Sequence, residues 1–166
     1  NKNKIKVLID DDHAFLRRGL IQILSETLGL EVVAEAGNGH EVLDLIRKTN
    51  LDVVVMDISM PEKTGWDVLM QLKTQKSRLP VIILSVAPED SYAVTMLKSG
   101  AAGYLTKSSA PELLVEAIRK VAGGGKFISP ALAEKLVEDL EPDSDRPPRE
   151  TLSPREFQIM TMIASG

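Results

Sequence analysis

The chain of 166 residues contains no cysteine. This absence excludes disulfide frameworks, thiolate zinc sites and cysteine nucleophiles. Long apolar runs are missing too, since none approaches the roughly 20 residues that a membrane helix requires. Residues 1–4 lead directly into a predicted strand, without the apolar core of a signal peptide. We therefore expect a cytoplasmic protein with no membrane partner.

Aromatic residues are scarce, and acidic residues outnumber basic ones. Aromatic residues make up 4% of the chain, and its net charge is −4. A negative chain has no general attraction for nucleic acid, so DNA binding would require a local surface or further residues. The hydrophobic fraction of 43% and charged fraction of 27% are typical of a globular protein. The length fits one domain of about 100 to 150 residues with an appendage.

Short apolar runs alternate with segments of helical periodicity along most of the chain. Strands are predicted at residues 5–10, 31–36, 53–57, 80–84 and 102–105, and each is followed by a helical pattern. In the first helix, apolar residues from Phe15 to Leu28 recur at helical spacing up to Gly29. The second helix opens with a capping box from Asn38 to Glu41. Five β/α units in succession predict an α/β fold with a doubly wound, five-stranded parallel sheet.

Asp57 ends the most apolar of these strands. The run from Val53 to Met56 has no polar alternation, which is typical of a strand buried on both faces of a parallel sheet. Asp57 would therefore lie at the carboxyl edge of the sheet, where ligands and chemistry collect in α/β folds. The alternative is that Asp57 only opens a turn over residues 58–61.

The first strand ends in three carboxylates, Asp10, Asp11 and Asp12. In a doubly wound sheet the first and third strands are neighbours, so these side chains would share a crevice with Asp57. Two unit charges about 4 Å apart repel by about 4 kcal/mol at an effective dielectric constant of about 20, so the cluster requires a cation or raised pKa values. Mg²⁺ is the natural candidate, because it prefers oxygen ligands.

The two remaining strand ends add Ser85, a hydroxyl donor, and Lys107, a point charge suited to a phosphate. An acid pair, a central aspartate, a hydroxyl and a lysine together predict a phosphoryl site. The alternative is that these residues are solvated turns or helix caps. His13 and His40 are isolated in the sequence, and we expect both on the surface of helices and neither as a metal ligand.

Several motifs in order resemble the receiver domain of two-component response regulators over residues 4–122. They are Asp11-Asp12-His13, Asp57-Ile58-Ser59-Met60-Pro61 with Gly65, Ser85, and Gly103-Tyr104-Leu105-Thr106-Lys107. The resemblance implies a flavodoxin-like fold that binds Mg²⁺. It implies Asp57 as phosphoacceptor, Asp11 and Asp12 as metal-binding acids, Ser59 as a metal ligand through its carbonyl, Ser85 and Lys107 as phosphoryl contacts, and Tyr104 as the switch aromatic.

The end of the chain resembles the opening helix of a LuxR-type helix-turn-helix domain, which points to the NarL/FixJ family. The residues that carry this resemblance are Leu152-Ser153-Pro154-Arg155-Glu156 and Ile163-Ala164-Ser165-Gly166. The expected organisation is a receiver domain at 1–122, a linker at 123–150 with a helix at 130–140, and an incomplete DNA-binding domain at 151–166. The recognition helix that reads bases would lie beyond these residues.

The function implied is regulation of transcription by phosphorylation. A sensor histidine kinase or a small phosphodonor would modify Asp57, and DNA would bind through the full C-terminal domain and not through these 166 residues alone. A homodimer is a further expectation. One departure from the family pattern is Asp10, because an apolar residue is usual before the acid pair; its carboxylate would either add to the acidity of the site or point to solvent.

Two other functions fit parts of the pattern. A Mg²⁺-dependent phosphatase or phosphotransferase could act on an external substrate through an aspartyl phosphate, but it would need a cap or substrate pocket, and the sequence has no insertion large enough. A flavodoxin-like cofactor module would need a phosphate-binding loop after the first strand. Residues 10–12 occupy that position and would repel a phosphate in the absence of a metal.

Overall fold

A parallel sheet of five strands organises the computed structural model, which describes residues 4–58, 65–75, 77–85, 91–109, 111–129, 132–134 and 137–138. The strands are β1 (Ile5–Asp10), β2 (Leu30–Ala36), β3 (Val53–Asp57), β4 (Val81–Ser85) and β5 (Gly103–Thr106). Their order is β2-β1-β3-β4-β5, and each neighbouring pair is parallel. The predicted doubly wound sheet is confirmed, and β1 lies beside β3 as expected.

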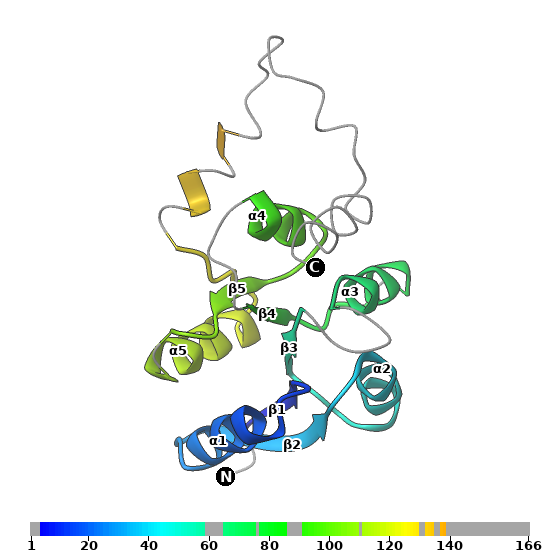
Figure 1. Ribbon diagram of the computed structural model, residues 1–166, viewed down its shortest axis with the longest axis vertical. Coiled ribbons are helices and arrows are strands. Elements are labelled where there is room, and N and C mark those ends of the chain that lie inside the picture. The colour runs from blue at the N-terminus through cyan, green and yellow to red at the C-terminus, as the bar shows by residue number, and fades with distance from the viewer. Residues whose placement is uncertain are drawn as a thin grey trace.

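Helices cover both faces of the sheet (Figure 1). They are α1 (Ala14–Ser25), α2 (Gly39–Lys48), α3 (Gly65–Thr74), α4 (Ser91–Lys98) and α5 (Pro111–Ala122). One apolar cluster joins α2, α3 and α4 to the sheet, and a second joins α1 and α5 to its other face. Within the part of the chain that the structure describes, no helix has both the length and the apolar character to cross a lipid bilayer.

Local sequence signals set the ends of two helices. At the start of α2, Asn38 Oδ1 accepts a hydrogen bond from the Glu41 N–H at 3.0 Å, and Asn38 Nδ2 donates to Glu41 Oε1 at 3.0 Å. The first bond satisfies an otherwise unpaired helix N–H, as the predicted capping box requires, and the second joins the two side chains. Helix α5 begins at Pro111 and is followed by Gly124, whose φ of 96° suits glycine at a helix end.

The first helix ends earlier than the sequence pattern predicts. Helix α1 ends at Ser25, and the side chains of Phe15 and Leu28 are 95% and 89% exposed. A row of residues four positions apart, which includes Leu20 and Leu24, packs α1 against the sheet. Phe15 lies off this row, and Leu28 lies beyond the end of the helix. The prediction that the helical pattern continues to Leu28 is therefore wrong.

The segment after α5 returns to the sheet. The Phe127 N–H donates to the Ala102 carbonyl at 2.9 Å, and residue 127 forms an isolated parallel bridge with Gly103. Leu132 is fully buried in the cluster that includes Tyr104. Residues 132–134 and 137–138 are helical, which covers part of the predicted linker helix at 130–140. The remaining residues of that helix, and the predicted domain at 151–166, lie outside the described residues.

Candidate functional site

Asp57 lies at the carboxyl end of β3, at the centre of the sheet. Every residue of β3 is buried, and the Asp57 side chain is 3% exposed. Its strand pairs with β1 on one side and with β4 on the other, so the ends of both neighbours flank it. The Asp57 carboxylate thus lies at the carboxyl edge of the sheet, which is the position that the sequence predicted for it.

Lys107 reaches Asp57 from beyond the end of β5. Its backbone N–H donates to the Ser85 carbonyl at 2.7 Å, which holds the start of the loop against β4. Its Nζ donates to Asp57 Oδ2 at 2.9 Å and forms an ion pair with Asp11 Oδ2 at 3.1 Å. Burial favours a lower pKa for the Lys107 ammonium, but hydrogen bonds and charges from Asp57 and Asp11 outweigh it and raise the pKa above its ordinary value.

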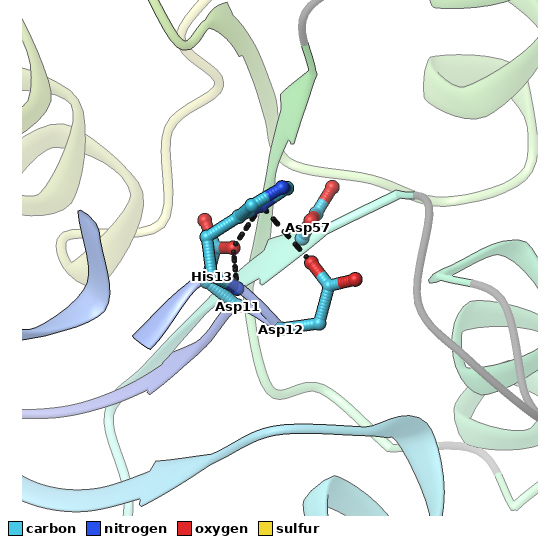
Figure 2. Close-up of side chains that lie close together, drawn as sticks. All are labelled: Asp11, Asp12, His13 and Asp57. Atoms are coloured by element: carbon cyan, nitrogen blue, oxygen red, sulfur yellow. Dashed lines mark hydrogen bonds and ion pairs between the residues drawn. The ribbon is translucent and has the colours of Figure 1, made fainter. Parts of the chain in front are cut away.

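The acid pair follows β1 and contacts His13 (Figure 2). Asp11 Oδ1 accepts hydrogen bonds from the His13 N–H at 2.8 Å and lies 3.1 Å from His13 Nδ1. His13 Nδ1 is also 3.1 Å from Asp12 Oδ1. The Asp11 side chain is fully buried, whereas that of Asp12 is 33% exposed. The pair therefore spans from the interior of the crevice to its solvent-facing rim.

Together these residues form a donor set for a cation. Asp11, Asp12, His13 and Asp57 each offer one ligand atom, and the four atoms lie within 4.8 Å of one another. Figure 2 shows the four side chains gathered at the ends of β1 and β3. Three of the four groups are carboxylates, which are the oxygen donors that Mg²⁺ prefers, and the exposed Asp12 leaves room for bound water. The residues present fit a hard divalent cation.

Asp10 is buried on the opposite side of β1 from Asp11. Its side chain is 1% exposed, and neither carboxylate oxygen has a hydrogen-bond partner among the residues that the structure describes. Burial, followed by repulsion from Asp57 and Asp11, raises the pKa of Asp10 to about 8. The alternative that Asp10 points to solvent is therefore wrong. Its buried carboxyl is a further acidic group close enough to Asp57 and Asp11 to be repelled by them.

The other predicted residues are placed as follows. Ser85 ends β4 and is 3% exposed, and Tyr104 lies within β5 and is 1% exposed. The side chain of Tyr104 belongs to the apolar cluster on the face covered by α2, α3 and α4, on the far side of the sheet from α1 and α5. Ser59 lies outside the described residues, so the expected contribution of its carbonyl is not tested.

Two residues were misjudged or missed from the sequence. The expectation that His13 is isolated is wrong, because its ring contacts both members of the acid pair. Its position directly after the acids was the available signal. The expectation that His13 is not a metal ligand stays a prediction. Arg17 was missed altogether, although its Nη1 donates to the Asp11 carbonyl and to the Ala36 carbonyl, the latter at 3.4 Å. No short motif marks this arginine, since its role depends on how α1 leaves the sheet.

Comparison with known families and proteins gives a consistent result. Residues 7–119 match the family described as the response regulator receiver domain. The chain is 38% identical to the response regulator GacA of Pseudomonas aeruginosa, in an alignment that covers 97% of this chain and 76% of GacA. It is 37% identical to the response regulator UvrY of Escherichia coli, over 98% of this chain and 75% of that protein.

Solved structures show the same likeness. A two-component response regulator of the LuxR family from Aurantimonas sp. superposes with a TM-score of 0.75 and 31% identity, over 82% of this chain and 97% of that one. The receiver domain of the response regulator NarL from Mycobacterium tuberculosis gives a TM-score of 0.70 and 32% identity, over 74% of this chain and 98% of the other.

Proposed function

Because the chain belongs to the receiver family of two-component response regulators, with relatives of the NarL/FixJ type, we propose that Asp57 is its phosphoacceptor. The observation that carries the proposal is the position of Asp57, which is buried at the end of β3 with the Lys107 ammonium 2.9 Å from its Oδ2. A nucleophilic carboxylate and a cation suited to phosphate oxygens thus share one crevice.

The reaction is transfer of a phosphoryl group to a carboxylate oxygen of Asp57. A new P–O bond forms to Asp57 as the P–N bond of a phosphohistidine, or the P–O bond of an acyl phosphate, breaks. The electron pair of that bond leaves with the imidazole or with the carboxylate of the acyl phosphate. Lys107 stays protonated, because its neighbours raise its pKa, and it stabilises the charge on the transferring oxygens.

Mg²⁺ is the cofactor that we propose for this site. Asp11, Asp12 and Asp57 would hold it, and the Ser59 carbonyl is a further proposed ligand. The three carboxylates lie within the same 4.8 Å cluster. When bound, Mg²⁺ would neutralise charge on the phosphoryl oxygens. In its absence the ion pair of Lys107 with Asp11 balances part of the same negative charge.

The response to phosphorylation is proposed to pass through Ser85 and Tyr104. Both are buried, and they belong to neighbouring strands that pair in register near the site. The Ser85 hydroxyl would move toward the phosphoryl group and so vacate space for rotation of the Tyr104 ring. Rotation would alter the surface around α4 and β5. A local change of charge at Asp57 would in this way shift the equilibrium between two conformations.

The proposed partners follow from the family. A sensor histidine kinase or a small phosphodonor would supply the phosphoryl group in the cytoplasm, and a homodimer is a possible output state. One similar solved structure, 30% identical, is described as a DNA-binding response regulator of the LuxR family from Staphylococcus aureus. We propose that DNA binding by this protein requires the full C-terminal domain, and that residues 1–166 alone do not bind DNA specifically.

Response regulators are signalling proteins and not classical enzymes. We propose that the only chemistry of this chain is its own phosphorylation and dephosphorylation. The alternative of a phosphatase or phosphotransferase acting on an external substrate is not favoured, because the relatives reported above are response regulators.

Intact-protein mass measurement after treatment with acetyl phosphate tests the proposal. We expect the parent chain to gain the mass of one phosphoryl group with Mg²⁺ present and none in excess EDTA. Asp57→Asn should gain none in either condition and retain the circular dichroism of the parent. Asp44→Asn, which changes an exposed aspartate on α2, is the matched control and should behave as the parent does. A phosphoryl gain in Asp57→Asn would place the acceptor elsewhere.

A gel-shift titration tests the DNA-binding part. We expect no sequence-selective shift with residues 1–166, and a selective, phosphorylation-dependent shift with a chain that carries the complete helix-turn-helix. Selective binding by residues 1–166 would contradict the proposal.

A further inference from the structure

We propose that Arg17 is a positioning residue for the acid pair, and that it sets the Mg²⁺ affinity of the site by fixing the peptide group between Asp11 and Asp12. The inference rests on the proposed function, and it concerns a residue that neither motif nor metal-ligand chemistry singles out. Arg17 contacts none of the reacting atoms. Its effect passes through the backbone.

The Arg17 guanidinium joins three elements of the fold. From the first turns of α1, its Nη1 donates to the Asp11 carbonyl just past the end of β1. The same nitrogen lies 3.4 Å from the carbonyl of Ala36, at the end of β2, and Nε donates to Glu35 Oε1 at 3.0 Å. The side chain is 18% exposed, so most of it is packed between these partners.

Asp11 is held at each of its polar atoms. Its N–H donates to the Ala36 carbonyl at 3.2 Å, Oδ1 accepts from the His13 N–H, and Oδ2 is paired with Lys107. Its carbonyl is the atom that Arg17 holds. This carbonyl belongs to the peptide plane that joins Asp11 to Asp12, so its direction sets the angle at which Asp12 leaves the strand. Arg17 thereby orients both acids relative to each other.

Arginine is suited to this task and lysine is not. A guanidinium presents several N–H groups in one rigid plane, which lets it bond Glu35 and the Asp11 carbonyl in fixed directions, whereas an ammonium is a flexible point charge. Space around the group is also limited, since a Cβ built on Gly37 would lie 3.4 Å from Arg17 Nη1. The neighbouring Arg18 is exposed and makes a natural comparison.

The charge of Arg17 and its positioning role predict opposite changes in Mg²⁺ affinity when Arg17 is removed. A guanidinium near the acid cluster repels a divalent cation, so loss of its charge alone would tighten Mg²⁺ binding. Loss of positioning would weaken it, because groups that orient metal ligands typically contribute about 10- to 100-fold to affinity. The sign of the change therefore separates the two roles.

The experiment is calorimetric titration of Mg²⁺ into the unphosphorylated protein. We expect the dissociation constant to rise about tenfold in Arg17→Ala and in Arg17→Lys, and to stay unchanged in Arg18→Ala. The Asp12 amide, which shares the peptide plane with the Asp11 carbonyl, should shift in the ¹⁵N spectrum of the Arg17 variants. Circular dichroism checks that each variant is folded, and Arg17→Gln replaces Arg17→Ala if the latter does not fold.

Each outcome decides the proposal. Tighter or unchanged Mg²⁺ binding in a folded Arg17→Ala or Arg17→Gln variant overturns it, and so does full recovery of affinity in Arg17→Lys. Failure of the proposed function looks different, because the parent chain itself would then neither bind Mg²⁺ nor gain a phosphoryl group from acetyl phosphate.

Discussion

Lys107 and Asp57, which are 50 positions apart in the chain, form a 2.9 Å hydrogen bond across the carboxyl edge of the sheet. Strand β4 lies between the strands that carry them, so the lysine extends over the end of β4 to reach the carboxylate. The same ammonium pairs with Asp11, the neighbour of Asp57 on the other side. One cation thus balances two buried acids that would otherwise repel each other.

Removal of Lys107 should destabilise the protein when no metal is present. In EDTA, Lys107→Ala leaves Asp11 and Asp57 without their common cation, and we expect the free energy of unfolding to fall by about 3 kcal/mol. Mg²⁺ should restore much of this loss, because it binds the folded state through the same carboxylates. Urea unfolding with and without Mg²⁺ measures both quantities.

Lys48→Ala is the matched control for this prediction. Lys48 pairs with Asp44 on the surface of α2 and is 69% exposed, so its removal should have no measurable effect on unfolding. If Lys107→Ala unfolds at the same urea concentration as Lys48→Ala in EDTA, Lys107 does not balance the charge of the acid pair.

Asp10 should make the stability of the protein depend on pH. Its folded-state pKa is raised from 3.8 to about 8, so the folded protein binds this proton more tightly than the unfolded chain does. The contribution of Asp10 to stability is therefore fully present below about pH 4 and is lost as the pH rises to about 8. An asparagine at position 10 is neutral and does not titrate, so a protein with this residue does not lose stability in this way as the pH rises.

We expect Asp10→Asn to be more stable than the parent by roughly 2 to 4 kcal/mol at pH 7.5 in EDTA. The difference should shrink steadily toward pH 4. Chemical unfolding of both proteins across this pH range measures it. Asp44→Asn should show no such gain, because the hydrogen bond from Lys48 lowers the pKa of Asp44. A difference that stays constant with pH would mean that folding does not raise the pKa of Asp10.

The fold could be predicted from the sequence because its signals are local and agree with one another. The apolar run of β3, the Asn38 cap and the proline at the start of α5 each follow from short-range chemistry. Asp57 and the acid pair could be placed in one crevice for the same reason, since strand ends in a parallel sheet share an edge.

The burial of Asp10 could also have been predicted. Side chains alternate along a strand, so Asp10 faces the same way as Leu8, which is fully buried in the cluster that α2 and α3 cover. Alternation alone therefore argued against the solvent-facing alternative. The absence of a partner for its carboxylate could not be predicted, because that depends on the neighbouring strands and helices.

The contacts of Arg17 were beyond sequence reasoning for a different reason. They depend on the direction in which the chain turns from β1 into α1, and on the side-chain rotamer that follows. No spacing rule predicts that an arginine in α1 will bond a carbonyl behind it. The pairing of Phe127 with β5 could not be predicted from the sequence either, because it is a long-range contact of a segment with weak strand character.

The return of the chain to β5 should be sensitive to one added methyl group. A Cβ on Gly103 would lie 3.2 Å from the Phe127 carbonyl oxygen and 3.5 Å from the Phe127 Cβ. We expect Gly103→Ala to displace residue 127 and expose its N–H, which now donates to Ala102. Hydrogen exchange of the Phe127 amide should then become faster, while the amides of β3 stay protected. Unchanged protection at Phe127 would show that the edge accommodates the methyl group.

Leu132 should anchor the same segment through its packing. It is fully buried in the apolar cluster that contains Tyr104, although it lies beyond α5 in the chain. Leu132→Ala removes buried methyl groups and leaves a cavity, so we expect the free energy of unfolding to fall by about 3 kcal/mol. Val137 is 58% exposed, and Val137→Ala should change it by less than about 0.5 kcal/mol. Urea unfolding compares the two variants, and equal midpoints would mean that Leu132 contributes nothing to the core around Tyr104.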